Sequence, residues 1–221
     1  MEMTTVRIFY SKTGRAKYIS HLDTMRTMTR ALRRSGLPLW YTQGFNPHLY
    51  ITFALPISLG YEGLCESFDI RLVEDISHSD IEKKMAAAMP LGFSVIRAAE
   101  PVADPAAIKW ADYSIKLIYS GDEAEKAVQS LGEFSTQPVI EVMKKSKKGP
   151  KPVDIKPLTE VLSCKREENI VSLAFRAAAG ISTNINPTLY LNAFYEQADI
   201  KPHGVRIVRT AIFDEKMQNF C

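Results

Sequence analysis

Segments with the periodicity of strands and of helices follow one another along this chain in a definite order. In the first half, apolar runs typical of strands are interrupted twice by apolar residues at helical spacing. Gly and Pro residues separate these segments. The expected elements are strands at 6–10, 48–57, 67–74 and 93–100 and helices at 20–36 and 79–89. This order of strand, helix, strand, strand, helix, strand is that of the split βαβ, or ferredoxin-like, unit.

A similar order follows a Pro- and Ala-rich segment at 100–107, which we interpret as a linker. The expected elements are strands at 111–120, 138–145, 168–179 and 205–214 and helices at 122–132 and 186–198, with 152–164 lying between the two middle strands. The sequence therefore predicts an α+β protein of tandem ferredoxin-like units. An N-terminal half at 1–103 would precede a C-terminal half at 108–221 with an enlarged middle hairpin.

Each half has two helices, which should cover one face of an antiparallel four-stranded sheet. The other face must then pack on the partner half, meet a ligand or face water. In nucleic-acid-binding proteins of this architecture the open sheet face often carries the contacts, but that is an analogy of fold and not a functional argument.

Composition is that of a globular protein. The chain has 221 residues, of which 46% are hydrophobic and 24% charged, and its net charge is only +3. No apolar run approaches the roughly 18 residues that span a bilayer, and the N-terminus does not read as a secretory signal. We therefore expect a cytoplasmic protein without a membrane span. Its cysteines, Cys65, Cys164 and Cys221, are far apart, which predicts reduced thiols and no iron–sulfur cluster motif.

Residues 18–36, YISHLDTMRTMTRALRRSG, carry the sharpest local signal. Ser20 is the expected helix N-cap and Asp23 its partner three residues on, while Gly36 and Pro38 end the helix. His21 lies beside the cap. The apolar sector is expected to hold four residues, namely Leu22, Met25, Met28 and Leu32.

The same helix carries four arginines. Arg26, Arg30 and Arg33 lie at i, i+4 and i+7 in one sector, and Arg34 lies just beyond. Like charges in this arrangement repel unless an anion compensates them, as RNA phosphate or an acidic protein surface would. The alternative is a solvated helix whose arginines pair with distant carboxylates.

A second basic feature is KKSKKGPK at 144–151. On a hairpin it would form a basic finger with sequence-independent affinity for phosphate, or else only a solubilising loop. Its five lysines are Lys144, Lys145, Lys147, Lys148 and Lys151. We expect the arginine sector and these lysines to converge on one concavity.

Residues 43–60 contain a constrained turn. Gly44, Asn46 and Pro47 fix it, and Phe45 and His48 project from it, which suits the stacking of a base or the positioning of a proton. The alternative is a hairpin turn with Phe45 buried in the core.

Motifs for catalysis or cofactors are weak or missing. His21 and His48 have no third ligand at metal-site spacing, and we find no nucleotide-binding fingerprint, so no metal or cofactor is expected. Asp154, set between Lys151 and Lys156, could act on RNA as a general base or a nucleophile, but such a residue more often pairs with a neighbouring lysine.

The stretches YSKTGRAKYISHLDTMRTMTRALRRSGLP and YTQGFNPHLYITFALPISLGYEG resemble the bacterial radical SAM-associated family, a domain of unknown function. The resemblance continues more loosely through KPVDIKPL and RIVRTAIF. The positions that match are Ser20, His21, Asp23, Arg26, Arg33, Gly44, Asn46, Pro47 and His48. Leu49 and Tyr50 follow His48 where the family pattern has a step like Pro-Lys. The resemblance therefore implies that this chain lacks one basic contact of the family.

This resemblance implies partnership with a radical SAM protein and, more weakly, a role in RNA metabolism. It assigns no catalytic residue, and the partner would have to carry the iron–sulfur cluster. Three hypotheses follow: an accessory protein that binds RNA or positions a substrate, an RNA-modifying or RNA-processing enzyme that uses Asp154 or His48, and a module that only docks on a protein.

Overall fold

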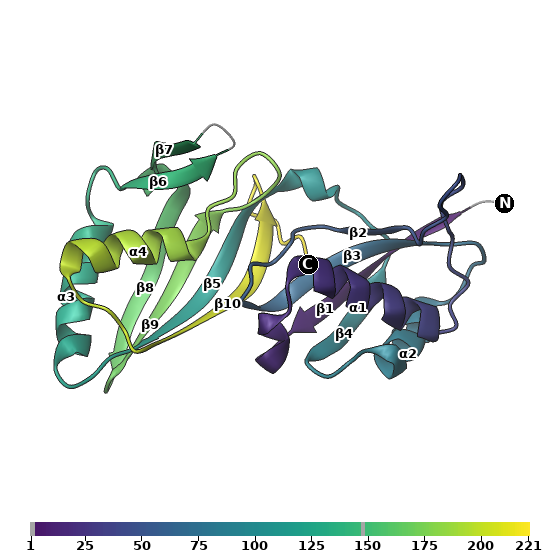
Figure 1. Cartoon of the computed structure of the whole chain (residues 1–221), viewed down its shortest axis with the longest axis horizontal. Helices are drawn as coiled ribbons and strands as arrows, with labels where there is room; N and C mark the ends of the chain where they lie inside the picture. The colour runs from purple at the N-terminus through teal and green to yellow at the C-terminus, as the bar shows by residue number, and fades with distance from the viewer. Residues whose placement is uncertain (1–2, 147–148) are drawn as a thin grey trace. The chain divides into compact units, whose positions relative to one another are not determined.

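The computed structural model describes residues 3–146 and 149–221, without the side chains of residues 145 and 146. These residues form two compact units of α+β structure (Figure 1). Unit 1 extends to Ile108 and also includes Asn219–Cys221, and unit 2 comprises Lys109–Gln218. In the part of the chain that the structure describes, no helix is long and apolar enough to cross a bilayer.

The described residues of unit 1 form four strands and two α-helices in the expected order. Its three longer strands are hydrogen-bonded in the order β4-β1-β3, and β2 pairs with β3, with every pair antiparallel. Only three residues of the apolar run at 48–57 become strand. The elements are β1 (Thr4–Lys12), the short 3-10 helix η1 (Gly14–Tyr18), α1 (His21–Arg34), β2 (Ile51–Phe53), β3 (Glu62–Leu72), α2 (His78–Ala88) and β4 (Phe93–Ala99).

Alternation places the core of unit 1 between this sheet and its two helices. Every second residue of β1 and β3 faces the helices, and opposite positions pair in register, as Ile8 does with Phe68. One cluster of buried residues includes Val6, Ile8, Tyr10, Phe68, Ile70 and Leu72 from the strands and Met28, Leu32, Ile81 and Met85 from α1 and α2.

The opposite face of this sheet is covered in part by the chain itself. Arg7 on β1 pairs in register with Asp69 on β3, and its guanidinium donates two hydrogen bonds to that carboxylate, of 2.7 and 2.8 Å. A third hydrogen bond reaches the carbonyl of Ala103, and the Phe220 ring lies 4.7 Å from the guanidinium carbon. Arg7 is thereby only 2% exposed.

In unit 2 four strands are hydrogen-bonded in the order β10-β5-β9-β8, and β6 and β7 form a separate hairpin. The helices α3 and α4 pack on this sheet, where Phe175 contacts Tyr190 and Phe134 contacts both Tyr190 and Phe194. Its elements are β5 (Ile108–Ile118), which follows the 3-10 turn η2 (Pro105–Ala107), α3 (Glu123–Ser135), β6 (Glu141–Ser146), β7 (Gly149–Asp154), the 3-10 turn η3 (Lys156–Leu158), β8 (Thr159–Glu167), β9 (Ile170–Ala178), α4 (Pro187–Ala198) and β10 (Gly204–Asp214).

The middle of unit 2 differs from the expectation. Residues 152–164 were expected only to separate two strands, but they contain the end of β7 and the first part of β8. The register of β8 against β9 shifts between Val161 and Ser163, as a β-bulge does. Because the extra residue breaks the period of two, the alternation that would reveal a strand is lost at this point.

Candidate functional site

The start of α1 has the predicted cap. The Ser20 hydroxyl accepts a hydrogen bond from the backbone N–H of Asp23, at 3.1 Å, and donates one to the Asp23 carboxylate, at 2.7 Å. The hydrogen bonds from Ser20 and then from Arg26 lower the pKa of Asp23. Ser20 and Asp23 are therefore hydrogen-bonded to each other across the first turn, and α1 begins at a defined residue.

The buried stripe of α1 is not the expected one. It consists of Thr24, Met28, Ala31 and Leu32, whereas Leu22 is 55% exposed and Met25 is half-buried. Small residues at 24 and 31 let the helix approach the core there. Successive residues of a helix are about 100° apart around its axis. By this spacing the arginine sector lies on the side of α1 opposite the buried stripe, and not next to it.

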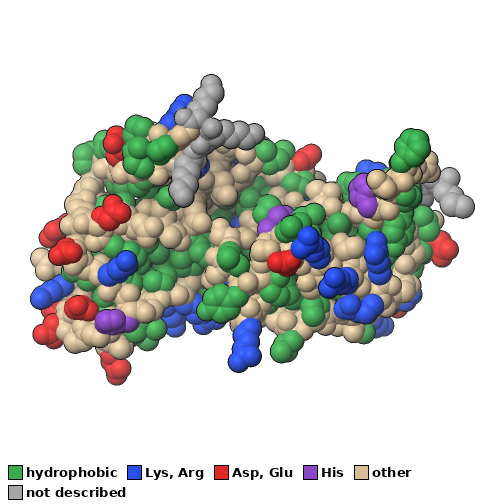
Figure 2. Space-filling model, viewed as in Figure 1, with side chains coloured by type: hydrophobic (Ala, Val, Ile, Leu, Met, Phe, Trp, Pro, Cys, Tyr) green, Lys and Arg blue, Asp and Glu red, His purple; other side chains and the backbone are tan. Residues whose placement is uncertain are grey.

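Arginine side chains therefore project from the solvent face of α1. Lys and Arg side chains gather over this helix in Figure 2. Arg26 pairs with the exposed Asp23, at 3.0 Å, and Arg34 donates to the carbonyl of Ala88. Arg30 and Arg33 are exposed, and neither makes a hydrogen bond or ion pair with any described residue. Two of the four guanidinium groups are thus available to an external anion.

A buried polar cluster lies under the start of α1, and sequence reasoning missed it. Lys12, at the end of β1, is fully buried and donates to the carbonyl of Ile19 at 2.7 Å. Glu62 and Glu66 on β3 are also buried, and Lys17 approaches Glu62 at 3.9 Å. The strand register explains the cluster, since Lys12 lies opposite Gly63 on β3. The only sequence signal was the basic composition of residues 12–17.

His21 joins this cluster to the apolar core. Its ring meets Phe53 edge-on, with 5.3 Å between ring centroids. Burial, and then the charge of Lys12, lower the pKa of His21 from its ordinary value of 6.5. The folded state therefore disfavours the charged imidazole.

This shift predicts a pH dependence of stability. Because the pKa of His21 is lower in the folded than in the unfolded chain, the unfolded chain binds more protons below pH about 6.5. The contribution of His21 to stability should be complete above that pH and be lost as pH falls through the folded pKa. Urea unfolding at pH 7.5 and 5.5 should show a smaller pH effect in His21→Phe, which retains the ring contact, than in the wild-type protein. Equal pH effects would contradict the assignment.

The turn at residues 44–48 presents an aromatic side chain to solvent. Phe45 is fully exposed and not buried in the core. The Thr42 hydroxyl lies 2.9 Å from Nδ1 of His48 and accepts a hydrogen bond from the His48 backbone N–H. Nδ1 of His48 also lies 3.2 Å from the carbonyl of Asn46, and Gly44 adopts a φ of +134°. His48 thus holds the turn closed, while Phe45 is free to stack on a ligand.

The lysine-rich stretch belongs to the β6-β7 hairpin of unit 2. Lys144 donates to the carbonyl of Asn184, and Lys151, opposite it in register, is exposed. The side chain of Lys145, and Lys147 and Lys148 entirely, lie outside the described residues. The arginine sector belongs to unit 1, so the shared concavity of the two basic segments stays a prediction.

Asp154 has a structural role at the end of this hairpin. Its Oδ1 accepts hydrogen bonds from the backbone N–H groups of Ile140 and Lys156, both at 3.0 Å. These bonds fix the corner between β7 and η3. Catalysis by Asp154 or His48 stays a prediction, and the contacts made by each residue are those of a turn.

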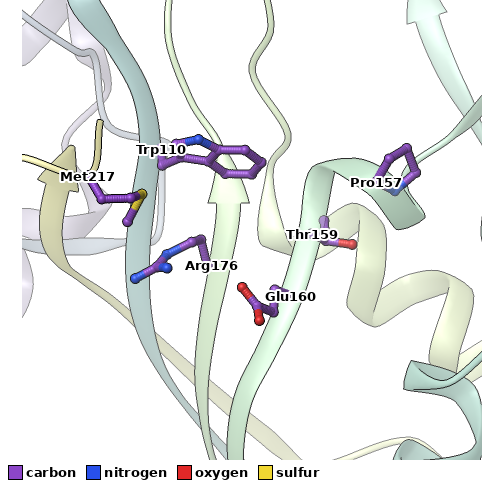
Figure 3. Close-up of a pocket in the computed structure, with 6 residues that line it drawn as sticks. All are labelled: Trp110, Pro157, Thr159, Glu160, Arg176 and Met217. Atoms are coloured by element: carbon purple, nitrogen blue, oxygen red, sulfur yellow. The ribbon is translucent and has the colours of Figure 1, made fainter. Parts of the chain in front are cut away.

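Unit 2 also contains a hollow of about 380 Å³ that sequence reasoning did not anticipate (Figure 3). One of its lining residues, Arg176 on β9, donates two hydrogen bonds to Asp112 on β5, of 2.7 and 2.9 Å. The bonds to Asp112 raise the pKa of Arg176. The residues that line the hollow are Trp110, Pro157, Thr159, Glu160, Arg176 and Met217.

Comparisons with known proteins place the chain among uncharacterised relatives. A family model described as "Uncharacterized protein conserved in bacteria (DUF2344)" matches residues 5–187. No curated protein matches the chain. One similar solved structure is described as "Crystal Structure of an Unknown Protein from Galdieria sulphuraria". It is 11% identical, the match covers 94% of this chain and 99% of that one, and the TM-score is 0.28.

Proposed function

We propose that this chain, which belongs to the family of uncharacterised proteins conserved in bacteria (DUF2344), is a non-catalytic RNA-binding accessory protein. We draw this proposal from the chain's own surface. The observation that carries this proposal is the pair Arg30 and Arg33, exposed on α1 without a partner among the described residues. RNA phosphates would compensate their mutual repulsion, which costs a few tenths of a kcal/mol per pair in an isolated helix.

The turn at 44–48 supports RNA over an acidic protein surface as the ligand. An exposed aromatic ring offers a platform for an unpaired base, and such stacking contributes about 1–3 kcal/mol per base. Phe45 has this exposure, and Thr42 and His48 hold the turn that presents it. An acidic protein surface would use the arginines but has no particular need of a fully exposed phenylalanine.

We infer that both units follow one split βαβ plan, because the strand order β4-β1-β3-β2 in unit 1 corresponds to β10-β5-β9-β8 in unit 2. Both units also carry a bidentate Arg–Asp pair across their first and third sheet strands, Arg7–Asp69 and Asp112–Arg176.

A radical SAM protein, which the sequence resemblance implies as the partner, would supply the cluster chemistry while this chain holds the RNA.

Charge reversal on α1 tests the RNA proposal. The variant Arg30→Glu with Arg33→Glu should bind a tRNA transcript at least tenfold more weakly in a filter assay at about 100 mM salt. Each lost phosphate contact should also reduce the slope of log affinity against log salt by about 0.7–0.9, so the slope should fall by roughly 1.5.

The matched control reverses two exposed lysines of unit 2, Lys126 and Lys201, which changes the net charge by the same amount. It should retain most of the affinity. Equal losses in the two variants would mean that bulk charge alone drives binding, and no loss in the arginine variant would reject the α1 surface. Capture of a protein partner that persists after nuclease treatment and depends on Arg30 and Arg33 would favour the docking module instead.

A further inference from the structure

We propose that the hollow on the sheet of unit 2 binds a guanine base, from a free nucleotide or from RNA. This site is separate from the arginine face of α1 and does not depend on it. The hollow, of about 380 Å³, is formed by Trp110 on β5, by β8 and β9, and by the turns that hold Pro157 and Met217 (Figure 3). A second hollow, of about 270 Å³, lies on the same strands and is lined in part by Asp112 and Lys165.

The polar groups of the site are set by strand register. Arg176 lies opposite Asp112 on one neighbouring strand and opposite Glu160 on the other. Its guanidinium is directed to Asp112, and the charge of Glu160 also acts on it. Asp112 accepts from Nε and Nη2 of Arg176 and thereby fixes the guanidinium in place. The remaining terminal nitrogen, Nη1, and both carboxylate oxygens of Glu160 make no hydrogen bond within the described part of the chain.

This leaves a fixed donor and a two-oxygen acceptor beside an aromatic ring. In Figure 3 the Trp110 ring and the Glu160 and Arg176 side chains border the same space. Unpaired bases bind proteins by stacking on aromatic rings while hydrogen bonds read their Watson–Crick edges. Trp110 would supply the stacking surface, and Met217 and Pro157 would supply apolar contact around the base.

The donor and acceptor pattern selects guanine. An ionised carboxylate only accepts hydrogen bonds and can accept two in parallel. Guanine is the RNA base whose Watson–Crick edge presents two adjacent donors, N1–H and the N2 amino group, with the O6 acceptor next to them. Glu160 would accept from both donors and Arg176 would donate to O6. Adenine and cytosine offer one amino donor on this edge and uracil a single N–H, so each would leave an oxygen of Glu160 unpaired.

NMR of the single indole of the Trp40→Phe protein tests this proposal, because Trp40 and Trp110 are the two tryptophans of the chain. GMP should shift the Nε1–H signal of Trp110 in a saturable manner, with an affinity at least tenfold higher than that of AMP, CMP or UMP. A hexamer of uridines with one central guanosine, compared with six uridines, reports whether the base is also recognised within RNA. Preference for GMP alone would assign the site to free nucleotides.

Substitutions then assign the contact. Glu160→Gln keeps the size of the side chain but removes one acceptor, and it should reduce GMP affinity at least tenfold. Glu167→Gln, an exposed glutamate at the far end of β8, should not change it. The Arg30→Glu and Arg33→Glu variant should retain GMP binding whatever happens to its RNA affinity. No shift with GMP, equal shifts with all four nucleotides, or full GMP affinity in Glu160→Gln would overturn the proposal.

Discussion

Replacing Asp69 with alanine should lower the free energy of unfolding of unit 1 by about 3–5 kcal/mol, the usual cost of removing one partner of a buried ion pair. Arg7 is 2% exposed and donates two hydrogen bonds to this carboxylate. The carbonyl of Ala103 and the Phe220 ring cannot replace the lost charge. Urea unfolding followed by Trp40 fluorescence in a Trp110→Phe background would measure the loss in unit 1.

The second Arg–Asp pair is the matched control. Asp112 and Arg176 have almost the same geometry, but their side chains are 18% and 23% exposed, so water can partly solvate Arg176 when Asp112 is removed. Asp112→Ala should therefore cost only about 1 kcal/mol, read from Trp110 in a Trp40→Phe background. Joint replacement of Arg7 by Met and Asp69 by Leu should recover much of the stability lost in Asp69→Ala. Equal losses for the two aspartates would show that burial does not set the cost.

Local signals in the sequence predicted the elements of unit 1 because each depends on neighbours along the chain. The cap at Ser20 involves a residue three positions away, and alternation along β1 and β3 reports directly which face is buried. The same reasoning failed at β8, where a bulge interrupts the alternation. It also placed Leu22 in the core, because a hydrophobic side chain was preferred over Thr24 and Ala31, which are the residues that pack there.

The candidate sites depend on contacts that no local pattern contains. The sequence showed which arginines share a side of α1, but not that Arg34 would bind the carbonyl of Ala88, 54 positions away. Nor did it show that Arg30 and Arg33 would have no partner among the residues that the structure describes. The guanine site has the same origin. Arg176 meets Asp112 and Glu160 only because β9 pairs with strands on both sides, in registers set by the whole sheet.

Gly92→Ala should destabilise unit 1 by about 2–4 kcal/mol, because backbone strain and overpacking add at this position. Gly92 adopts a φ of +87°, and an added Cβ would lie 2.8 Å from Cβ of Ala16 and 2.9 Å from the carbonyl oxygen of Thr13. Neither atom is the end of a flexible side chain, so η1 would have to move. That movement would also break the hydrogen bond from the Thr13 N–H to the carbonyl of Gly92, at 2.8 Å.

Gly36 separates the two contributions. Its φ of +67° imposes a similar backbone strain, but nothing lies within 4 Å of an added Cβ, so Gly36→Ala should cost only about 1–2 kcal/mol. The difference between the two variants, measured by urea unfolding with Trp40 as the probe, isolates the packing of η1 against the start of β4. The 3-10 helix η1 leads directly into the capped start of α1. If Gly92→Ala lowers the free energy of unfolding no more than Gly36→Ala does, η1 moves easily to accept the added Cβ. The arginine face of α1 would then not be rigidly held.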